Sequence, residues 1–103
     1  MKYLIVLSVL FFASSDKGYK QSFANYYTEA MDSVVVGNNK IVFQNVQPLE
    51  TTGFYNINKG TYGVTFITKS KKKFYSSITV PKTGTGNKTL EIDATVQIQV
   101  LEE

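Results

Sequence analysis

The densest cluster of charge in the sequence is a run of lysines followed directly by two aromatic residues. Its members are Lys69, Lys71, Lys72, Lys73, Phe74 and Tyr75. Ammonium groups beside aromatic rings can bind single-stranded nucleic acid, acidic polysaccharide or a lipid headgroup surface. The alternative is a solvated turn whose charge discourages aggregation at a sheet edge. The run is the candidate binding site, although the lack of a second cluster favours the solvated turn.

Glu91 and Asp93 lie two positions apart, a spacing at which two carboxylates on one strand face can share general acid and base work. No other residues mark a cleft around them, so solvated carboxylates are the favoured interpretation. The chain has no histidine, the commonest general base and the usual zinc ligand. It also lacks cysteine and a calcium-loop motif. We therefore predict no catalytic residues, no metal site and no cofactor.

All eleven basic residues are lysine, and the net charge is +3. Arginine is the side chain best suited to bidentate recognition of phosphate or guanine, so specific nucleic-acid recognition is disfavoured. The partner that these charges suggest is an unidentified protein or a polyanionic surface. Asn87-Lys88-Thr89 matches the N-glycosylation sequon, which makes Asn87 a candidate modification site in a secreted chain.

Residues 1–15 have the layout of a secretory signal peptide. Lys2 precedes an apolar run from Tyr3 to Phe12, and small residues follow before Asp16. The run is too short to cross a bilayer as a helix, so a lasting membrane anchor is disfavoured. A retained and buried strand or helix remains an alternative. The prediction is a secreted or extracytoplasmic chain with one domain, residues 16–103.

Residues 88–103 dominate the predicted architecture. Apolar residues alternate with polar ones from Leu90 to Val100, so a single long strand would have one apolar and one polar face. Such a strand needs an apolar partner layer. We predict that it follows a loop at residues 81–87, the clearest loop in the chain.

The preceding chain reads as strands joined by short turns, with one helix. Apolar residues recur at three- and four-residue spacing from Phe23 to Val34, which predicts the helix. Two hairpins follow, at residues 34–46 and 54–68, and then a turn at 69–73 and a strand at 74–80. Short connections imply antiparallel pairing. The fold class is mainly β, a small antiparallel sandwich or an open barrel.

One segment resembles known families. Thr52-Gly53-Phe54 followed by Gly60-Thr61-Tyr62-Gly63-Val64 resembles a segment of tumour necrosis factor-like jelly rolls, including complement-type heads. The spacing is one residue short, and a proline commonly found between the two parts is missing. The same residues also resemble transthyretin-like sandwich repeats. Both resemblances imply an antiparallel sandwich with a binding or structural role, and the first implies a trimer.

Two functions follow from these features. The leading one is a non-enzymatic extracytoplasmic binding or interaction module that acts through surface loops, chiefly residues 69–73 and 81–87. The alternative is a structural subunit of a symmetric assembly, a homo-oligomer such as a virion surface or fibre protein. An enzyme would have to work without histidine and is the least favoured class.

Overall fold

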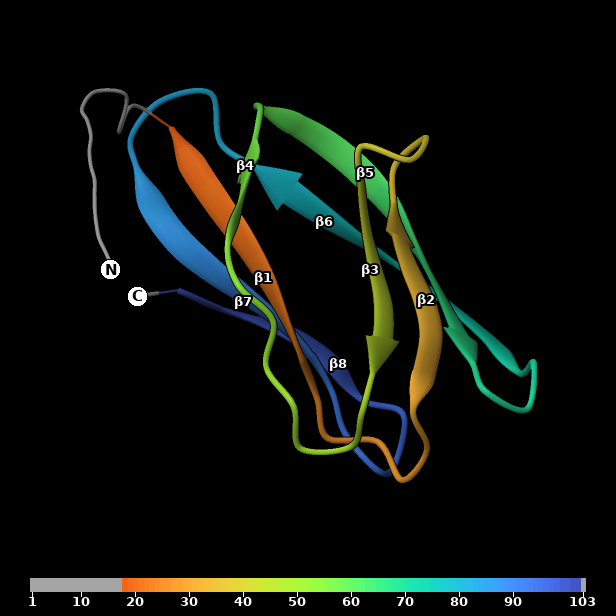
Figure 1. Ribbon diagram of the computed structural model, residues 1–103. Coiled ribbons are helices and arrows are strands. Elements are labelled where there is room, and N and C mark those ends of the chain that lie inside the picture. Colours follow the sequence, from red (N-terminus) through yellow and green to blue (C-terminus); the bar gives the residue numbers. More distant parts are fainter. Residues whose placement is uncertain (1–17, 103) are drawn as a thin grey trace, which may run out of the picture.

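The computed structural model describes residues 18–102, all of them in strands and their connections (Figure 1). The eight strands are β1 (Tyr19–Asn25), β2 (Met31–Val36), β3 (Ile41–Val46), β4 (Tyr55–Ile57), β5 (Gly60–Thr68), β6 (Lys73–Val80), β7 (Gly86–Ile92) and β8 (Ile98–Glu102). Within this range no helix could cross a membrane. The predicted signal peptide lies outside the described residues.

The strands form two four-stranded sheets that pack face to face. One sheet has the order β4-β1-β7-β8 and the other β3-β2-β5-β6. Alternating apolar residues along β5, among them Val64 and Phe66, point between the sheets and are buried. The β-sandwich predicted from the sequence is therefore confirmed at the level of architecture.

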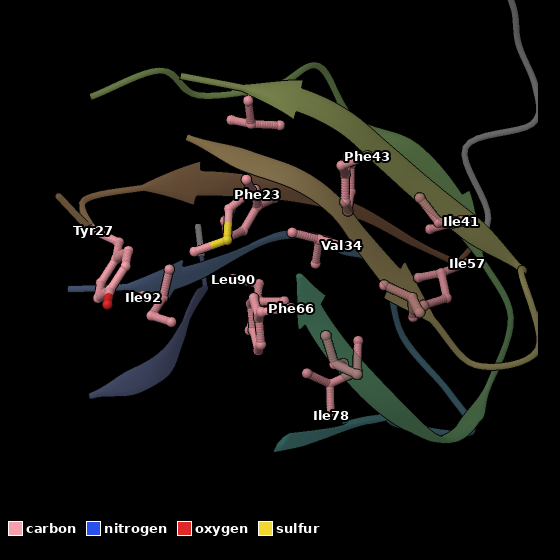
Figure 2. Packing of buried hydrophobic residues seen from close by; sticks show 14 of the residues in the cluster. Phe23, Tyr27, Val34, Ile41, Phe43, Ile57, Phe66, Ile78, Leu90 and Ile92 are labelled. Carbon is pink, nitrogen blue, oxygen red and sulfur yellow. The ribbon is translucent and has the colours of Figure 1, made fainter. Parts of the chain in front are cut away.

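Aromatic rings from both sheets form the centre of the core. Phe23 in β1 lies 6.0 Å from Phe43 in β3 and 5.9 Å from Phe66 in β5, measured between ring centroids. Figure 2 shows these side chains with Val34, Leu90 and others filling the space between the sheets. Packing of this kind must supply the stability of a domain that has no disulfides.

The helix predicted at residues 23–34 is wrong, because β1 and β2 occupy most of this range. Phe23, Tyr27, Met31 and Val34 are all buried, as a helical face would be, but they reach the core from two strands and the loop between them. The side chain of Asn25 holds that loop. It donates to the carbonyls of Glu29 and Val46 and accepts from the amide of Tyr27.

The single long strand predicted at residues 88–103 is also wrong, since it is broken into the β7–β8 hairpin. Asp93 accepts hydrogen bonds from the amides of Thr95 and Gln97, and Val96 has a φ of 63°. Ile92 pairs with Ile98, six residues on, so an even separation keeps both on the inner face. The alternation therefore survives the turn, while Val96 is left exposed.

Antiparallel pairing holds for all strand pairs within residues 18–102 except β1 and β7, which run parallel. The predicted hairpin at residues 54–68 is wrong as well. β4 pairs with β1, whereas β5 pairs with β2 and β6 in the other sheet. The turn at Asn58-Lys59 therefore links the two sheets. A short loop is compatible with a hairpin and with such a crossing, so loop length alone could not distinguish them.

Other turns agree more closely with the predictions made from the sequence. The β2–β3 hairpin is confirmed, and Gly37 and Asn39 in its turn have positive φ. The lysine run forms the turn between β5 and β6, as predicted. β1 begins at Tyr19, inside the polar segment 16–22 whose composition, with Gly18, is typical of a linker. Asn87 lies in β7 rather than in the predicted loop, with an exposed side chain.

Candidate functional site

The lysine run at the β5–β6 turn, here called the lysine tip (Lys69–Lys73), lies beside two carboxylates. Lys71 Nζ is 2.5 Å from Asp32 Oδ2, and Lys72 Nζ is 4.0 Å from Glu29 Oε2. The other oxygen of Glu29 accepts a 2.6 Å hydrogen bond from the amide of Ser70. Hydrogen bonds from Ser70 lower the pKa of Glu29, which keeps this carboxylate ionised. Much of the positive charge of the tip is thus balanced by its neighbours.

The two aromatic residues after the tip do not form one platform. The ring of Phe74 is half-buried and packs edge-on against Tyr27, with centroids 5.5 Å apart. Tyr75 is 69% exposed on the outer face of its sheet, next to Thr65. Successive side chains of a strand point to opposite faces, so only Tyr75 is available for a ligand. The structure does not assemble the predicted candidate residues into one site.

The opposite end of the sandwich contains an open hollow of about 590 Å³. The start of β1, the turn between β4 and β5 and the loop between β6 and β7 meet there, at the upper end of Figure 1. We call it the end hollow. Its lining residues are Gly18, Tyr19, Asn56, Ile57, Asn58, Lys59, Pro81, Lys82 and Gly84.

Two tyrosines hold the loops that carry the hollow's lysines. Tyr62 donates a 2.8 Å hydrogen bond from its hydroxyl to the carbonyl of Asn58, beside Lys59. Tyr19 donates similarly to the carbonyl of Thr83, at 3.1 Å, beside Lys82. Gly84 has a φ of +98°, and a Cβ at this position would lie 2.8 Å from the Tyr19 hydroxyl. The loop can therefore approach Tyr19 this closely only with glycine here.

Within the described part of the chain, the positive charge at the end hollow is unbalanced. Among residues 18–102, no carboxylate lies within ion-pair distance of Lys59 or Lys82. The carboxylate of Glu102, at the same end, is 2.8 Å from the buried Lys88 Nζ instead. Two exposed lysines that line one hollow suit an anionic ligand.

A second hollow of about 470 Å³ adjoins the first and shares Lys59, Pro81 and Lys82 with it. Its surface is mostly apolar, and Thr61 and Thr79, which also line it, hydrogen-bond to each other with their hydroxyl oxygens 3.2 Å apart. The two lysines therefore stand where the hollows meet.

The predicted carboxylate pair has structural roles. Asp93 Oδ1 accepts three hydrogen bonds that form the β7–β8 turn, and the Gln97 amide and Thr95 lower its pKa. Glu91 accepts a hydrogen bond from the Gln99 side chain. In the described part of the chain, no group of three or more acidic residues could hold a metal ion.

Sequence reasoning missed Lys59 and Tyr19 and gave Lys82 no role of its own, although it named the loop at residues 81–87. Each of these residues is isolated in the sequence, so no local density of charge marks it. The antiparallel pairing of β5 with β6, in which Gly60 lies opposite Val80, brings the turn at Lys59 beside the loop at Lys82. The predicted strands on either side of the turn at residues 69–73 were the sequence signal that could have brought these two lysines together.

Comparisons with known proteins identify the fold alone. The sequence matches no protein-family model and no curated protein. The structure is similar to the NMR structure of a protein from Eubacterium rectale, with a TM-score of 0.52 and 16% sequence identity. The similarity covers 84% of this chain and 88% of the other. At this identity the likeness supports the two-sheet architecture and carries no function.

Proposed function

We propose that this protein is a non-enzymatic binding module that holds an anionic ligand in the end hollow. One observation carries the proposal: Lys59 and Lys82 flank the same hollow, and no carboxylate between residues 18 and 102 pairs with either of them. The lysine tip is the weaker candidate, because Asp32 and Glu29 lie against Lys71 and Lys72. Of the two loops named from the sequence, residues 81–87 are therefore favoured over 69–73.

Binding is preferred to catalysis on chemical grounds. An exposed lysine is protonated at neutral pH and is a poor nucleophile or base unless burial lowers its pKa. Lys59 and Lys82 are both exposed. The carboxylates at residues 91 and 93 accept hydrogen bonds from neighbouring groups. None of the described residues that line the end hollow is a carboxylate or a histidine that could act as a general base.

The remaining parts of the proposal come from sequence. Residues 1–15 would export the chain, and N-terminal sequencing of the natural protein would show whether they are removed. A jelly-roll- or transthyretin-like type of sandwich, and the trimer that the former resemblance implies, belong to the same proposal. Secretion would also make Asn87 accessible for glycosylation in a suitable host.

The alternative is a structural subunit of a symmetric assembly, such as a virion surface or fibre protein. One observation favours it: the outer face of the β3-β2-β5-β6 sheet has a row formed by Val42, Val35, Thr65 and Tyr75. The outer members, Val42 and Tyr75, are 39% and 69% exposed. Size-exclusion chromatography with light scattering tests it, since a monomer across a wide concentration range would contradict assembly.

The anion-binding proposal is tested by titrating the ¹⁵N-labelled chain with tripolyphosphate. We expect amide shifts to concentrate at Asn56–Lys59 and Lys82–Gly84 and to weaken as salt is added. Replacing Lys59 and Lys82 by glutamine should weaken binding about tenfold, since each lysine contributes to polyanion attraction. The matched control, Lys69→Gln with Lys73→Gln, removes the same charge from the other end. Shifts centred on residues 69–73, or equal losses in both variants, would contradict the proposal.

A further inference from the structure

The shape of the site narrows the ligand to an extended chain. The end hollow and the second hollow are separate, yet Lys59, Pro81 and Lys82 line both. A small anion would occupy one of them and leave the other unused. A linear polymer could pass from one hollow to the other across the two ammonium groups.

The neutral polar groups along this path both donate and accept hydrogen bonds. Asn56 and Asn58 contribute amides to the first hollow, whereas the surface of the second is mostly apolar and its two hydroxyls, those of Thr61 and Thr79, hydrogen-bond to each other. Hydroxyl groups of a sugar also donate and accept, so they match amides and hydroxyls in both senses. A carboxylate or sulfate only accepts, and the lysines match it.

We infer that the ligand is an acidic polysaccharide, a chain of hydroxyl-bearing rings that carry carboxylate or sulfate groups. This inference rests on the proposed anion-binding function of the end hollow. The rings would lie along the two hollows, with an acidic group at Lys59 and Lys82. Their hydroxyls would exchange hydrogen bonds with the amide and threonine side chains.

Nucleic acid and membrane surfaces fit the same site less well. Bases need exposed aromatic rings for stacking, and Tyr19, the one ring lining the end hollow, has Lys88 Nζ 5.3 Å from its centroid. A membrane-binding loop needs apolar side chains that insert into lipid. Of the apolar lining residues, Ile57 and Val80 are buried, which leaves Pro81 exposed.

The test compares acidic chains with and without hydroxyl groups. Isothermal titration calorimetry would measure binding of an octamer of galacturonic acid, a heparin octasaccharide and an octamer of glutamic acid to the full chain. We expect the galacturonate octamer to bind about tenfold more tightly than the glutamate octamer, which has the same number of side-chain carboxylates, because only the saccharide uses the neutral polar groups. The galacturonate and heparin arms distinguish carboxylate from sulfate.

Three variants locate the interaction. Lys59→Gln with Lys82→Gln should weaken saccharide binding about tenfold, whereas Lys69→Gln with Lys73→Gln should weaken it less than about threefold. Asn58→Ala should weaken saccharide binding more than it weakens tripolyphosphate binding. If the glutamate and galacturonate octamers bound equally well while tripolyphosphate still bound at this end, the inference would be overturned and the proposed function upheld. If tripolyphosphate did not bind there either, both would be overturned.

Discussion

The two ends of the sandwich contain similar numbers of lysines but very different numbers of carboxylates. The tip end has Lys69, Lys71, Lys72 and Lys73, together with Glu29, Asp32, Glu50, Glu91 and Asp93. The hollow end has Lys20, Lys40, Lys59, Lys82 and Lys88, and Glu102 is the one carboxylate there among residues 18–102. The net positive charge of the described domain therefore lies at the hollow end, where no lysine cluster is visible in the sequence.

The ends also differ in how their loops are held. At the tip end a buried amide, Asn25, bonds to three backbone groups of the surrounding loops. At the hollow end the hydroxyls of Tyr19 and Tyr62 each reach a loop from partly buried rings. The loss of a buried group with several partners costs more than the loss of one peripheral hydrogen bond. We therefore expect the tip end to carry stability and the hollow end to carry recognition.

Replacing Asn25 by alanine should have the largest effect. It would leave the carbonyl of Val46 and the amide of Tyr27 without these partners in a buried environment, at a cost of about 2–4 kcal/mol. Urea unfolding followed by circular dichroism measures this change, with the exposed Asn87→Ala as control. If both variants unfolded at the same urea concentration, the stabilising role of the tip end would be wrong.

Gly84→Ala should have the next largest effect, and this effect should appear at the hollow end. The positive φ and the close approach of Tyr19 predict a loss of about 1–2 kcal/mol, or a shifted loop. Gly63→Ala is the matched control, since a Cβ there meets nothing within 4 Å. We expect weaker tripolyphosphate binding only in the Gly84 variant. Equal binding in the two variants would show that the loop position is unimportant for recognition.

The sandwich could be predicted because its strands obey local rules. Period-two alternation in β5 and β6 and the Gly37-Asn38-Asn39 turn are short-range signals, and the structure agrees with them. The helix prediction failed because residues 23–34 satisfy helical spacing by coincidence. Phe23 and Met31 enter the core from separate strands, and a tertiary contact, the bond from Asn25 to Val46, favours the loop between them.

The candidate site was harder to predict because charge along a sequence is not charge in space. Lys71 and Asp32 are 39 residues apart, so the sequence shows the cation cluster without its counterions. Lys59 and Lys82 are separated along the chain and meet because β5 pairs with β6, with Gly60 opposite Val80. The fold thus places carboxylates beside the lysine tip, which is conspicuous in the sequence, and brings together Lys59 and Lys82, which are not.

Removing the carboxylates that pair with the tip lysines should make the two ends alike, because both would then have unpaired positive charge. Glu29→Gln with Asp32→Asn would free Lys72 and Lys71 and create a second polyanion site, with a several-fold rise in total tripolyphosphate binding, roughly the gain expected for two released lysines. New amide shifts should appear at residues 69–73. Glu50→Gln with Glu91→Gln adds the same charge without releasing a lysine. A gain as large in this control would mean that overall charge, not local pairing, decides binding.

Acidification should have the smallest effect. It should make the two ends alike, as the double substitution does, because it protonates the carboxylates at the tip end. The pKa values of Glu29 and Asp93 are lowered in the folded protein, so their contribution to stability is complete above the ordinary carboxyl range, about pH 4 to 5, and is lost as pH falls through the folded values. Asp93→Asn should flatten this loss in urea unfolding measured from pH 7 to pH 3. A stability profile unchanged by the substitution would contradict a role for the ionised turn.

The hollow end provides the internal reference for this acid titration. Among residues 18–102 no carboxylate is paired with Lys59 or Lys82, so acid removes no counterion there. Protonation of Glu29, by contrast, removes the carboxylate that faces Lys72 and accepts from Ser70. A heparin octasaccharide keeps its sulfate charge in acid, so its amide shifts at Lys59 should persist while new ones develop at the tip. Simultaneous changes at both ends would indicate general unfolding rather than release of the tip lysines.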